Sequence, residues 1–254
     1  MRWLLSLILM LAVPGGIAWA QTLAIYCEED PPNQMVGSAG QLTGMTLEIA
    51  TEIKKRTGNQ DPIQLVPWAR GYDAAQKNPN VVLFSVTRTA ERNQLFYWIG
   101  PVLESSYGFY AKADSGIKLK SLEEARKLKR IGVYLSDVRD TFLTDAGFQN
   151  LDRTANNIQN FKKLMAGRLD VYASASLAIE NEARAAGYKG TDVKLVFTFM
   201  RVQLYIVMSK GTPDSLVKAW SSAFASMQKD GSFAALHRKY YPALSLPGKA
   251  ITEF

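Results

Sequence analysis

The chain has 254 residues, of which 47% are hydrophobic, and this provides enough apolar material for one large or two modest domains. The formal net charge is +7, but basic residues are interleaved with acidic ones, which argues against a nucleic-acid-binding surface. Because there is one cysteine, Cys27, and one histidine, His237, the chain has no internal disulfide and no cluster suited to zinc. We therefore expect no metal, no cofactor and no nucleic-acid partner, with Cys27 buried and His237 on the surface of a late helix.

Residues 1–20 have the composition of an export signal. Arg2 begins the segment, residues 3–13 form an apolar run that is too short for a stable membrane span, and Ala18-Trp19-Ala20 is a small-x-small cleavage site. We expect cleavage after Ala20 and export to the periplasm, with Gln21 as the first mature residue. An uncleaved anchor is the alternative.

Strand and helix patterns alternate over the first part of the mature chain. Apolar or alternating runs at 22–26, 63–66 and 81–84 predict strands. Helical spacing predicts a helix that Gly58 ends and another that ends near Asn78-Pro79. Strand, helix, strand, helix, strand is typical of a parallel sheet covered by helices.

A second unit of the same kind follows. Its expected elements are a crossing strand at 105–111, strands at 130–135, 171–173, 193–199 and 203–208, and helices at 161–165, 176–186, 213–227 and 232–240. We predict an α/β fold with two lobes, each a mainly parallel sheet flanked by helices: residues 21–107 and 202–254 form lobe 1, and 108–201 form an inserted lobe 2. Two hinge crossings, at Ser105–Gly108 and Met200–Gln203, predict a clamshell with a ligand in its crevice.

A candidate anion-binding corner follows the strand at 81–84. If that strand ends near Phe84 and a helical turn begins near Thr89, then Ser85, Thr87 and Arg92 point into one crevice. Hydroxyl donors and a guanidinium fork suit a carboxylate. A solvated surface turn is the alternative explanation of the same residues.

Several short motifs carry a resemblance to a known family. They are Gly44–Ala50, Val66–Arg70, Ser85–Arg92, Leu164–Asp170 and Asp230–Ser232. In this order and at these distances, the chain resembles the periplasmic solute-binding proteins of ABC importers, in the branch that binds polar amino acids. The resemblance implies a type II periplasmic-binding fold, capture of a small anionic or zwitterionic solute by clamshell closure, and delivery to an ABC permease by a monomer.

The resemblance also implies which residues touch the ligand. Arg92 would bind its carboxylate, helped by Ser85 and Thr87, and the ring of Trp68 would line the pocket. Backbone N–H groups of the helix start at Ser136–Arg139, with Val138 and Arg139 as the ligand-binding candidates, would meet the same carboxylate. Further candidates are Asp30, Arg70, Tyr134 and Ser174.

One departure leaves the ligand class open. Amino-acid receptors of this kind place an acidic residue five positions after Asp170 to hold the ligand ammonium, and here that position is Ala175. Either Asp30 or Glu29 supplies the charge, or the ligand is an organic acid. A dehydratase-like enzyme and a sensor or accessory protein are the alternative functions. We expect no enzyme, because the sequence offers no nucleophile–base pair.

Overall fold

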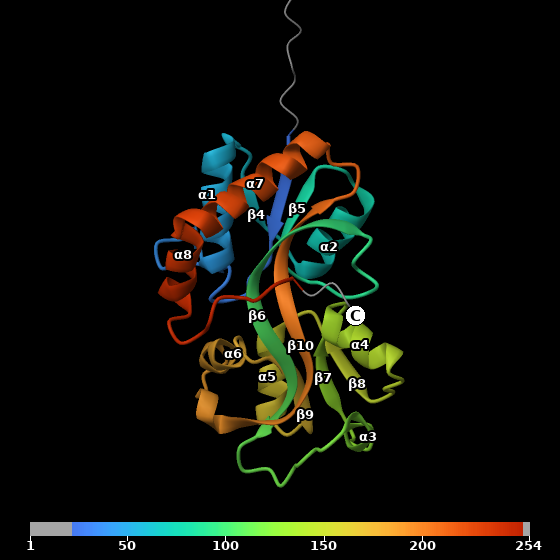
Figure 1. The fold of residues 1–254 in the computed structure, drawn as a ribbon. Helices are drawn as coiled ribbons and strands as arrows, with labels where there is room; N and C mark the ends of the chain where they lie inside the picture. Colours follow the sequence, from blue (N-terminus) through green and yellow to red (C-terminus); the bar gives the residue numbers. More distant parts are fainter. Residues whose placement is uncertain (1–21, 251–254) are drawn as a thin grey trace, which may run out of the picture.

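One eight-stranded sheet runs through the whole computed structural model, which describes residues 22–250 (Figure 1). The strands are β1 (Ala24–Cys27), β2 (Met35–Val36), β3 (Leu42–Thr43), β4 (Ile63–Leu65), β5 (Val81–Thr87), β6 (Phe96–Lys112), β7 (Ile131–Tyr134), β8 (Leu151–Thr154), β9 (Val171–Ala175) and β10 (Val193–Ser209). The helices are α1 (Met45–Thr57), α2 (Trp68–Lys77), α3 (Leu122–Ala125), α4 (Val138–Asp145), α5 (Asn157–Met165), α6 (Ile179–Ala185), α7 (Asp214–Asp230) and α8 (Ser232–Tyr240), with a 3-10 turn at Gly190–Asp192. Within residues 22–250, no helix has both the length and the apolar character that a membrane span requires. The predicted export signal and its cleavage site lie outside the described residues.

The sheet is mainly parallel in each lobe, and its two long central strands are antiparallel to their neighbours. Its order is β4-β1-β5-β10-β6-β9-β7-β8. In the upper lobe of Figure 1, lobe 1, β4, β1 and β5 are parallel, and in lobe 2 β9, β7 and β8 are parallel. The long strands β6 and β10 are antiparallel to their neighbours. This arrangement confirms the predicted two-lobed α/β fold, whereas the predicted boundaries at residues 107 and 201 stay predictions.

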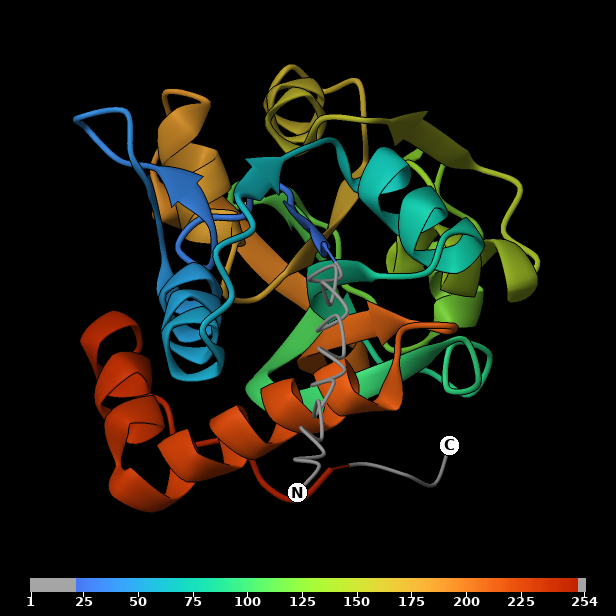
Figure 2. The same cartoon turned by 90° about the horizontal axis from the view of Figure 1, so that it is seen from above.

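Helices cover both faces of the sheet in lobe 1. The run Val81–Phe84 is apolar at every position because both faces of β5 are buried. Val82 and Phe84 belong to the core cluster that contains residues of α1 and α7, whereas Val81 and Leu83 belong to the cluster of α2. Seen from above, α1 and α2 lie on opposite sides of the central strands (Figure 2).

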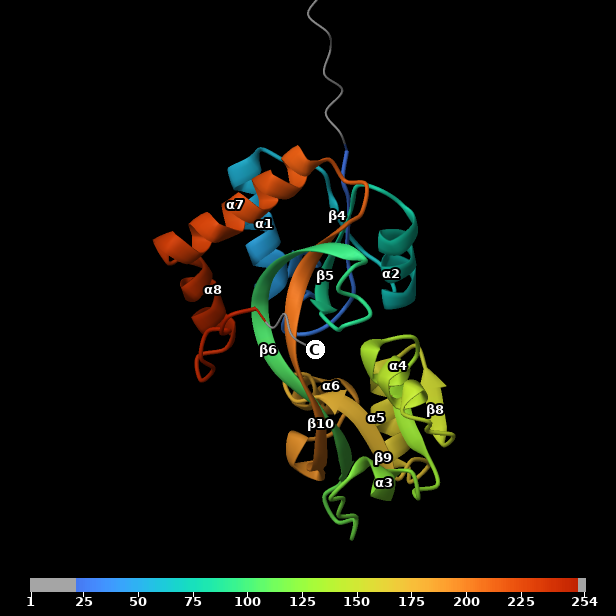
Figure 3. The same cartoon turned by 45° about the vertical axis from the view of Figure 1, so that its right-hand side comes forward.

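Strands β6 and β10 pass from one lobe to the other and form both crossings (Figures 1 and 3). The prediction of separate strands at 193–199 and 203–208 is wrong, because β10 is one strand of 17 residues. Its register against β6 shifts between Thr198 and Met200 and again between Leu204 and Ile206. Such bulges bend a strand and exchange the faces of its side chains without ending its pairing, so the apolar pattern breaks where the strand does not.

The sequence predicts that Cys27 is buried and that His237 is exposed, and the structure confirms only the first prediction. Cys27 is fully buried in β1. The prediction that His237 lies on the surface is wrong, because its side chain is 1% exposed between the rings of Phe233 and Tyr241. Phe233 and His237 are four residues apart on α8, so both point toward α1 and α7.

Candidate functional site

A small cavity lies between the lobes, against the middle of β6 and β10, and we call it the inner cavity. Its volume is about 60 Å³. Lobe 1 lines it with Glu28, Asp30, Trp68, Ser85, Thr87 and Arg92, and lobe 2 lines it with Asp137, Val138, Arg139, Ala175 and Glu182. The structure thus brings together seven of the predicted ligand-binding residues: Asp30, Trp68, Ser85, Thr87, Arg92, Val138 and Arg139.

Arg92 reaches the cavity from the turn that follows β5. Its side chain is only 5% exposed, and its guanidinium carbon lies 4.7 Å from the ring centroid of Tyr72 and 5.7 Å from that of Trp68. Both rings belong to α2, and they hold the guanidinium in place through cation–π contacts. No acceptor among the described residues takes a hydrogen bond from its guanidinium nitrogens. The donors of Arg92 are therefore free for an acceptor in the cavity.

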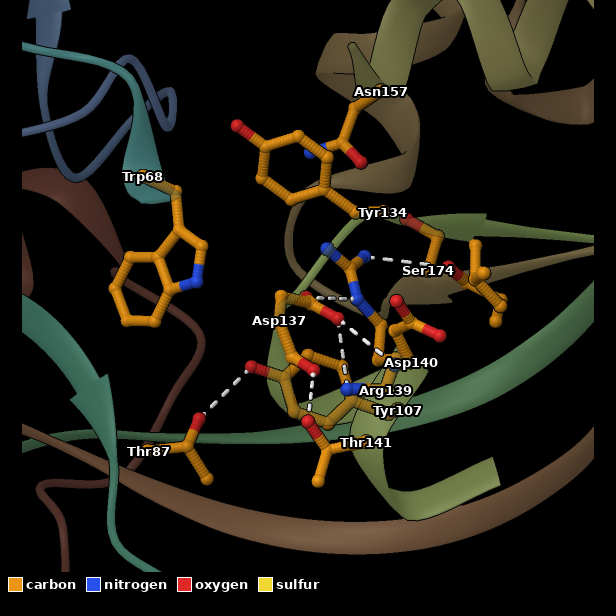
Figure 4. Close-up of polar contacts among 12 residues, drawn as sticks. Trp68, Thr87, Tyr107, Tyr134, Asp137, Arg139, Asp140, Thr141, Asn157 and Ser174 are labelled. Atoms are coloured by element: carbon orange, nitrogen blue, oxygen red, sulfur yellow. Dashed lines mark hydrogen bonds and ion pairs between the residues drawn. The ribbon is translucent and has the colours of Figure 1, made fainter. Parts of the chain in front are cut away.

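The two predicted hydroxyl residues lie beside Arg92 at the end of β5. The prediction that the strand ends near Phe84 is wrong, since β5 continues through Thr87. Ser85 has a φ of 56°, and its Oγ accepts a hydrogen bond from Gln34 Nε2 at 2.6 Å. Thr87 Oγ1 lies 3.0 Å from the hydroxyl of Tyr107 (Figure 4). Because Ser85 only accepts in this contact, its own O–H remains available as a donor.

Arg139 of lobe 2 is paired with Asp137 (Figure 4). Its Nε donates to Asp137 Oδ2 at 2.6 Å, and both residues are buried. Asp137 Oδ1 accepts from the backbone N–H groups of Arg139 and Asp140, at 2.8 and 3.2 Å. The prediction that backbone N–H groups here meet a ligand carboxylate does not hold for Arg139, because Asp137 caps the helix itself, whereas for Val138 it stays a prediction. The pair leaves Arg92 as the uncompensated cation of the cavity.

Three carboxyls, Glu28, Asp30 and Glu182, form what we call the acidic wall of the cavity. Glu182 is 7% exposed, and its carboxyl accepts hydrogen bonds from Ser174 Oγ at 2.7 Å and from the Tyr172 hydroxyl at 3.2 Å. Burial raises the pKa of Glu182 to about 7, although Arg139 and these hydrogen bonds act against the rise. Burial and the charge of Asp30 raise the pKa of Glu28 to about 8. Within residues 22–250, no three Asp, Glu, His or Cys side chains are grouped to hold a metal ion.

A larger hollow of about 400 Å³ continues from the acidic wall, and we call it the outer chamber. It shares Glu28, Glu29, Asp30, Asn157, Ala178 and Glu182 with the inner cavity. The rest of its lining is mostly apolar or amide-bearing: Pro31, Leu65, Val66, Pro67, Tyr134, Ala155, Asn156, Ile158, Asn181 and Ala185. Tyr134, a predicted ligand residue, lies here and not in the inner cavity.

Two predicted ligand residues lie outside both hollows. Arg70 is exposed and lines a separate shallow groove over α2 and α4. Ser174 is fully buried behind the cavity, where it supports Glu182. The residues that the sequence analysis overlooked are Glu182, Glu28 and Tyr107. A signal for Glu182 exists, since it lies three residues after Ile179 and one before Ala183, on the buried face of α6.

Among residues 22–250, three side-chain hydrogen bonds join the lobes across the cleft, in addition to the contacts at the hinge strand β6. Trp68 Nε1 of lobe 1 donates to the backbone oxygen of Ser136 at 3.1 Å. The Tyr134 hydroxyl of lobe 2 donates to Glu28 Oε2 at 3.1 Å, and Asn181 Nδ2 donates to the backbone oxygen of Pro31 at 3.1 Å. Figure 4 shows Trp68 facing Tyr134 and Arg139 from the opposite side of the cleft. The lobes are therefore in contact around the inner cavity.

Solved structures share this fold at low sequence identity. A histidine kinase sensor domain with similarity to periplasmic binding proteins has a TM-score of 0.80 and 19% identity, and the match covers 89% of this chain and 98% of that one. The ancestral amino acid-binding protein AncCDT-1, a precursor of cyclohexadienyl dehydratase, has a TM-score of 0.71 and 22% identity, over 87% and 95% of the two chains. Because a sensor and a dehydratase precursor both have this fold, the likeness does not distinguish among these functions.

Sequence comparison adds a relative and a family. The L-cystine-binding protein TcyJ of Escherichia coli K12 is 29% identical over 220 residues, which cover 84% of this chain and 79% of that protein. The model of one family, described as bacterial extracellular solute-binding proteins, family 3, matches residues 23–243. This match spans both lobes and every residue of the inner cavity. The chain is therefore a member of family 3 of the bacterial extracellular solute-binding proteins.

Proposed function

We propose that the protein captures a small carboxylate-bearing solute between its lobes in the periplasm and delivers it to an ABC permease of the inner membrane. The observation that carries this proposal is the guanidinium of Arg92, which is buried, faces the cavity and donates to no acceptor among the described residues. Burial of an unpaired charge is costly, and a solute carboxylate would compensate for it with two parallel hydrogen bonds. The E. coli relative, whose name says that it binds L-cystine, supports an amino-acid-type solute.

Closure of the lobes is the second part of the proposal. A solute that contacts Arg92 on lobe 1 and Glu182 on lobe 2 favours the closed arrangement, because only that arrangement offers both contacts. The three hydrogen bonds across the cleft add to this preference. A monomer released by cleavage after Ala20 is the form expected to act.

We infer a binding protein and not an enzyme. The named relative is a binding protein, and the hydrogen bonds that Ser174 and Tyr172 give Glu182 hold its carboxyl in one position, which suits a ligand contact. Incubation with amino acids and organic acids, followed by chromatography, is expected to return each compound unchanged. Turnover of any of them would contradict a pure binding role.

Replacement of Arg92 tests the capture site. Isothermal titration calorimetry with the solute found by a thermal-shift screen should show that Arg92→Ala weakens binding at least tenfold. A hydrogen bond to a charged group is worth about 1.5–3 kcal/mol, and the bidentate contact involves two. Arg70→Ala removes an arginine that lies outside the cavity, so this variant should bind the solute with the affinity of the unmodified protein. Equal affinities for all three proteins would contradict the proposed site.

A further inference from the structure

The acidic wall lies at the junction of two hollows. Glu28, Asp30 and Glu182 line the inner cavity on one side and the outer chamber on the other. At roughly 10–15 Å³ for each water-sized group, the inner cavity of about 60 Å³ holds a carboxylate and a few further heavy atoms. The outer chamber of about 400 Å³ has room for much more. A solute longer than the smallest amino acids that binds Arg92 must therefore pass the acidic wall.

The charge of the outer chamber has one sign. Glu28, Glu29, Asp30 and Glu182 contribute carboxyls to its lining, and no residue of that lining is a lysine or an arginine. Arg139, the lobe 2 cation that lines the adjoining inner cavity, is already paired with Asp137. The unpartnered and buried guanidinium of Arg92 marks the opposite end of the same cleft. The cleft thus has a positive inner end and a negative middle, and a solute with the complementary charges matches both.

We propose that the acidic wall, with Glu182 as its lobe 2 member, binds a positively charged group of the solute, and that the outer chamber takes an extended side chain. The solute is then an amino acid of the length of arginine or cystine, not an organic acid. Glu182 supplies from α6 the counter-charge that Ala175 cannot provide from the end of β9. This inference rests on the proposed capture at Arg92 and adds the solute class to it.

Four probes of known charge and length test the solute class. L-Arginine and L-cystine are long and carry positive groups, L-alanine is short, and succinate is an anion without a positive group. By calorimetry at pH 7.5, at least one of the two long amino acids should bind ten times more tightly than L-alanine and than succinate. Succinate as the tightest of the four, or no binding by either long amino acid, would overturn the inference.

A pair of variants on one helix tests the role of Glu182. Glu182→Gln removes the charge but can still accept the hydrogen bond from Ser174, so the variant should fold. Its affinity for the long amino acid should fall at least tenfold. Glu180→Gln is the matched control, because Glu180 is exposed on the same helix and forms an ion pair with Arg184 on the surface. Equal affinities of the two variants would overturn the assignment of Glu182.

Proton release provides a second readout. Glu28 faces Asp30, Asp137, Arg139 and Tyr134, and Glu182 faces Arg139, Tyr172 and Asp30, so both carboxyls are partly protonated near neutral pH in the empty protein. A cation placed against them favours their ionised forms. Calorimetry in buffers of different ionisation enthalpy should detect protons released when L-arginine or L-cystine binds, and fewer with Glu182→Gln. Binding of either amino acid without proton release would contradict a cation at the acidic wall.

Failure of the inference differs from failure of the proposed function. If an organic acid binds tightly and Arg92→Ala abolishes its binding, capture at Arg92 stands and the acidic wall has another role. If an amino acid binds and Arg92→Ala leaves its affinity unchanged, the capture site itself is wrong.

Discussion

Arg92 and Glu182 are both buried, yet their surroundings differ. The carboxyl of Glu182 is supported by two protein donors, whereas the guanidinium of Arg92 is supported by aromatic faces and its hydrogen-bond donors stay free. Aromatic contact holds the position of a cation without using its N–H groups. Arg92 is thus preorganised for a ligand, because little of its conformational freedom remains to be lost on binding.

The sequence predicts Arg92 and its hydroxyl neighbours because they lie within eight residues of one strand end. It does not predict Glu182, because the contact depends on how α6 folds back against β9. It also does not predict that the Asp137 side chain takes up the backbone N–H group of Arg139, which was expected to be free for a ligand. Local chemistry can be read from neighbouring residues, whereas contacts between distant elements cannot.

His237 provides a test of pH dependence at this scale. Both of its ring nitrogens are buried without a hydrogen-bond partner among the described residues, and burial lowers its pKa. The folded state therefore holds a neutral imidazole, while the unfolded chain binds a proton below about pH 6.5. Because the unfolded state binds more protons there, this group makes the protein less stable as the pH falls through that value. His237→Phe should remove the loss.

Urea denaturation at pH 7.5 and pH 5.5 measures this effect. The stability of the unmodified protein relative to His237→Phe should be lower at pH 5.5 than at pH 7.5. Glu28 and Glu182 also titrate, but they are present in both proteins, so their effect on stability is removed when the two stabilities are subtracted. The same difference at both pH values would contradict a neutral buried imidazole.

At the scale of elements, β6 and β10 matter most because they join the lobes as one continuous pair. The sequence predicts where the chain crosses, since residues 105–111 have a strand pattern. It does not predict that each strand continues for 17 residues, because the register shifts hide the period of the side chains. Strand pairing is thus maintained across the hinge, which favours bending of the pair over separation.

Gly108 tests the close approach of these strands. A Cβ atom at this position would lie 2.4 Å from Leu195 Cδ1 and 2.7 Å from the backbone oxygen of Phe197, both on β10. Gly108→Ala should therefore force the strands apart and lower the free energy of unfolding by about 1–3 kcal/mol, as overpacking does. Gly116→Ala is the control, because no atom lies within 4 Å of its added Cβ. Equal stability of the two variants in urea would show that the strands are not closely packed at Gly108.

At the scale of the whole molecule, the two lobes face each other across a cleft that charged residues line. Trp68, Tyr134 and Asn181 each donate a hydrogen bond across it, and these contacts surround the residues of the proposed site. The C-terminal segment after α8 crosses the hinge strands (Figure 1), where the backbone N–H of Gly248 donates to Glu104 at 2.9 Å. The lobes thus contact each other at the cleft, and the segment around Gly248 is attached to the hinge strand β6, on which Glu104 lies.

Asn181 tests the energy of closure. Asn181→Ala removes the hydrogen bond to Pro31, which is worth about 0.5–1.5 kcal/mol. The affinity for the solute should fall roughly two- to thirteenfold, because the closed arrangement loses one contact that the open one lacks. Small-angle X-ray scattering should give a larger radius of gyration for this variant than for the unmodified protein at the same subsaturating solute concentration. Identical affinity and identical scattering would show that this contact contributes nothing to closure.

A crystal structure of the protein with its bound solute tests the central claim most directly. We predict a carboxylate with both oxygens about 2.7–2.9 Å from the guanidinium nitrogens of Arg92, inside a closed cleft. A solute bound elsewhere, with the guanidinium of Arg92 making no contact to it, would contradict the account.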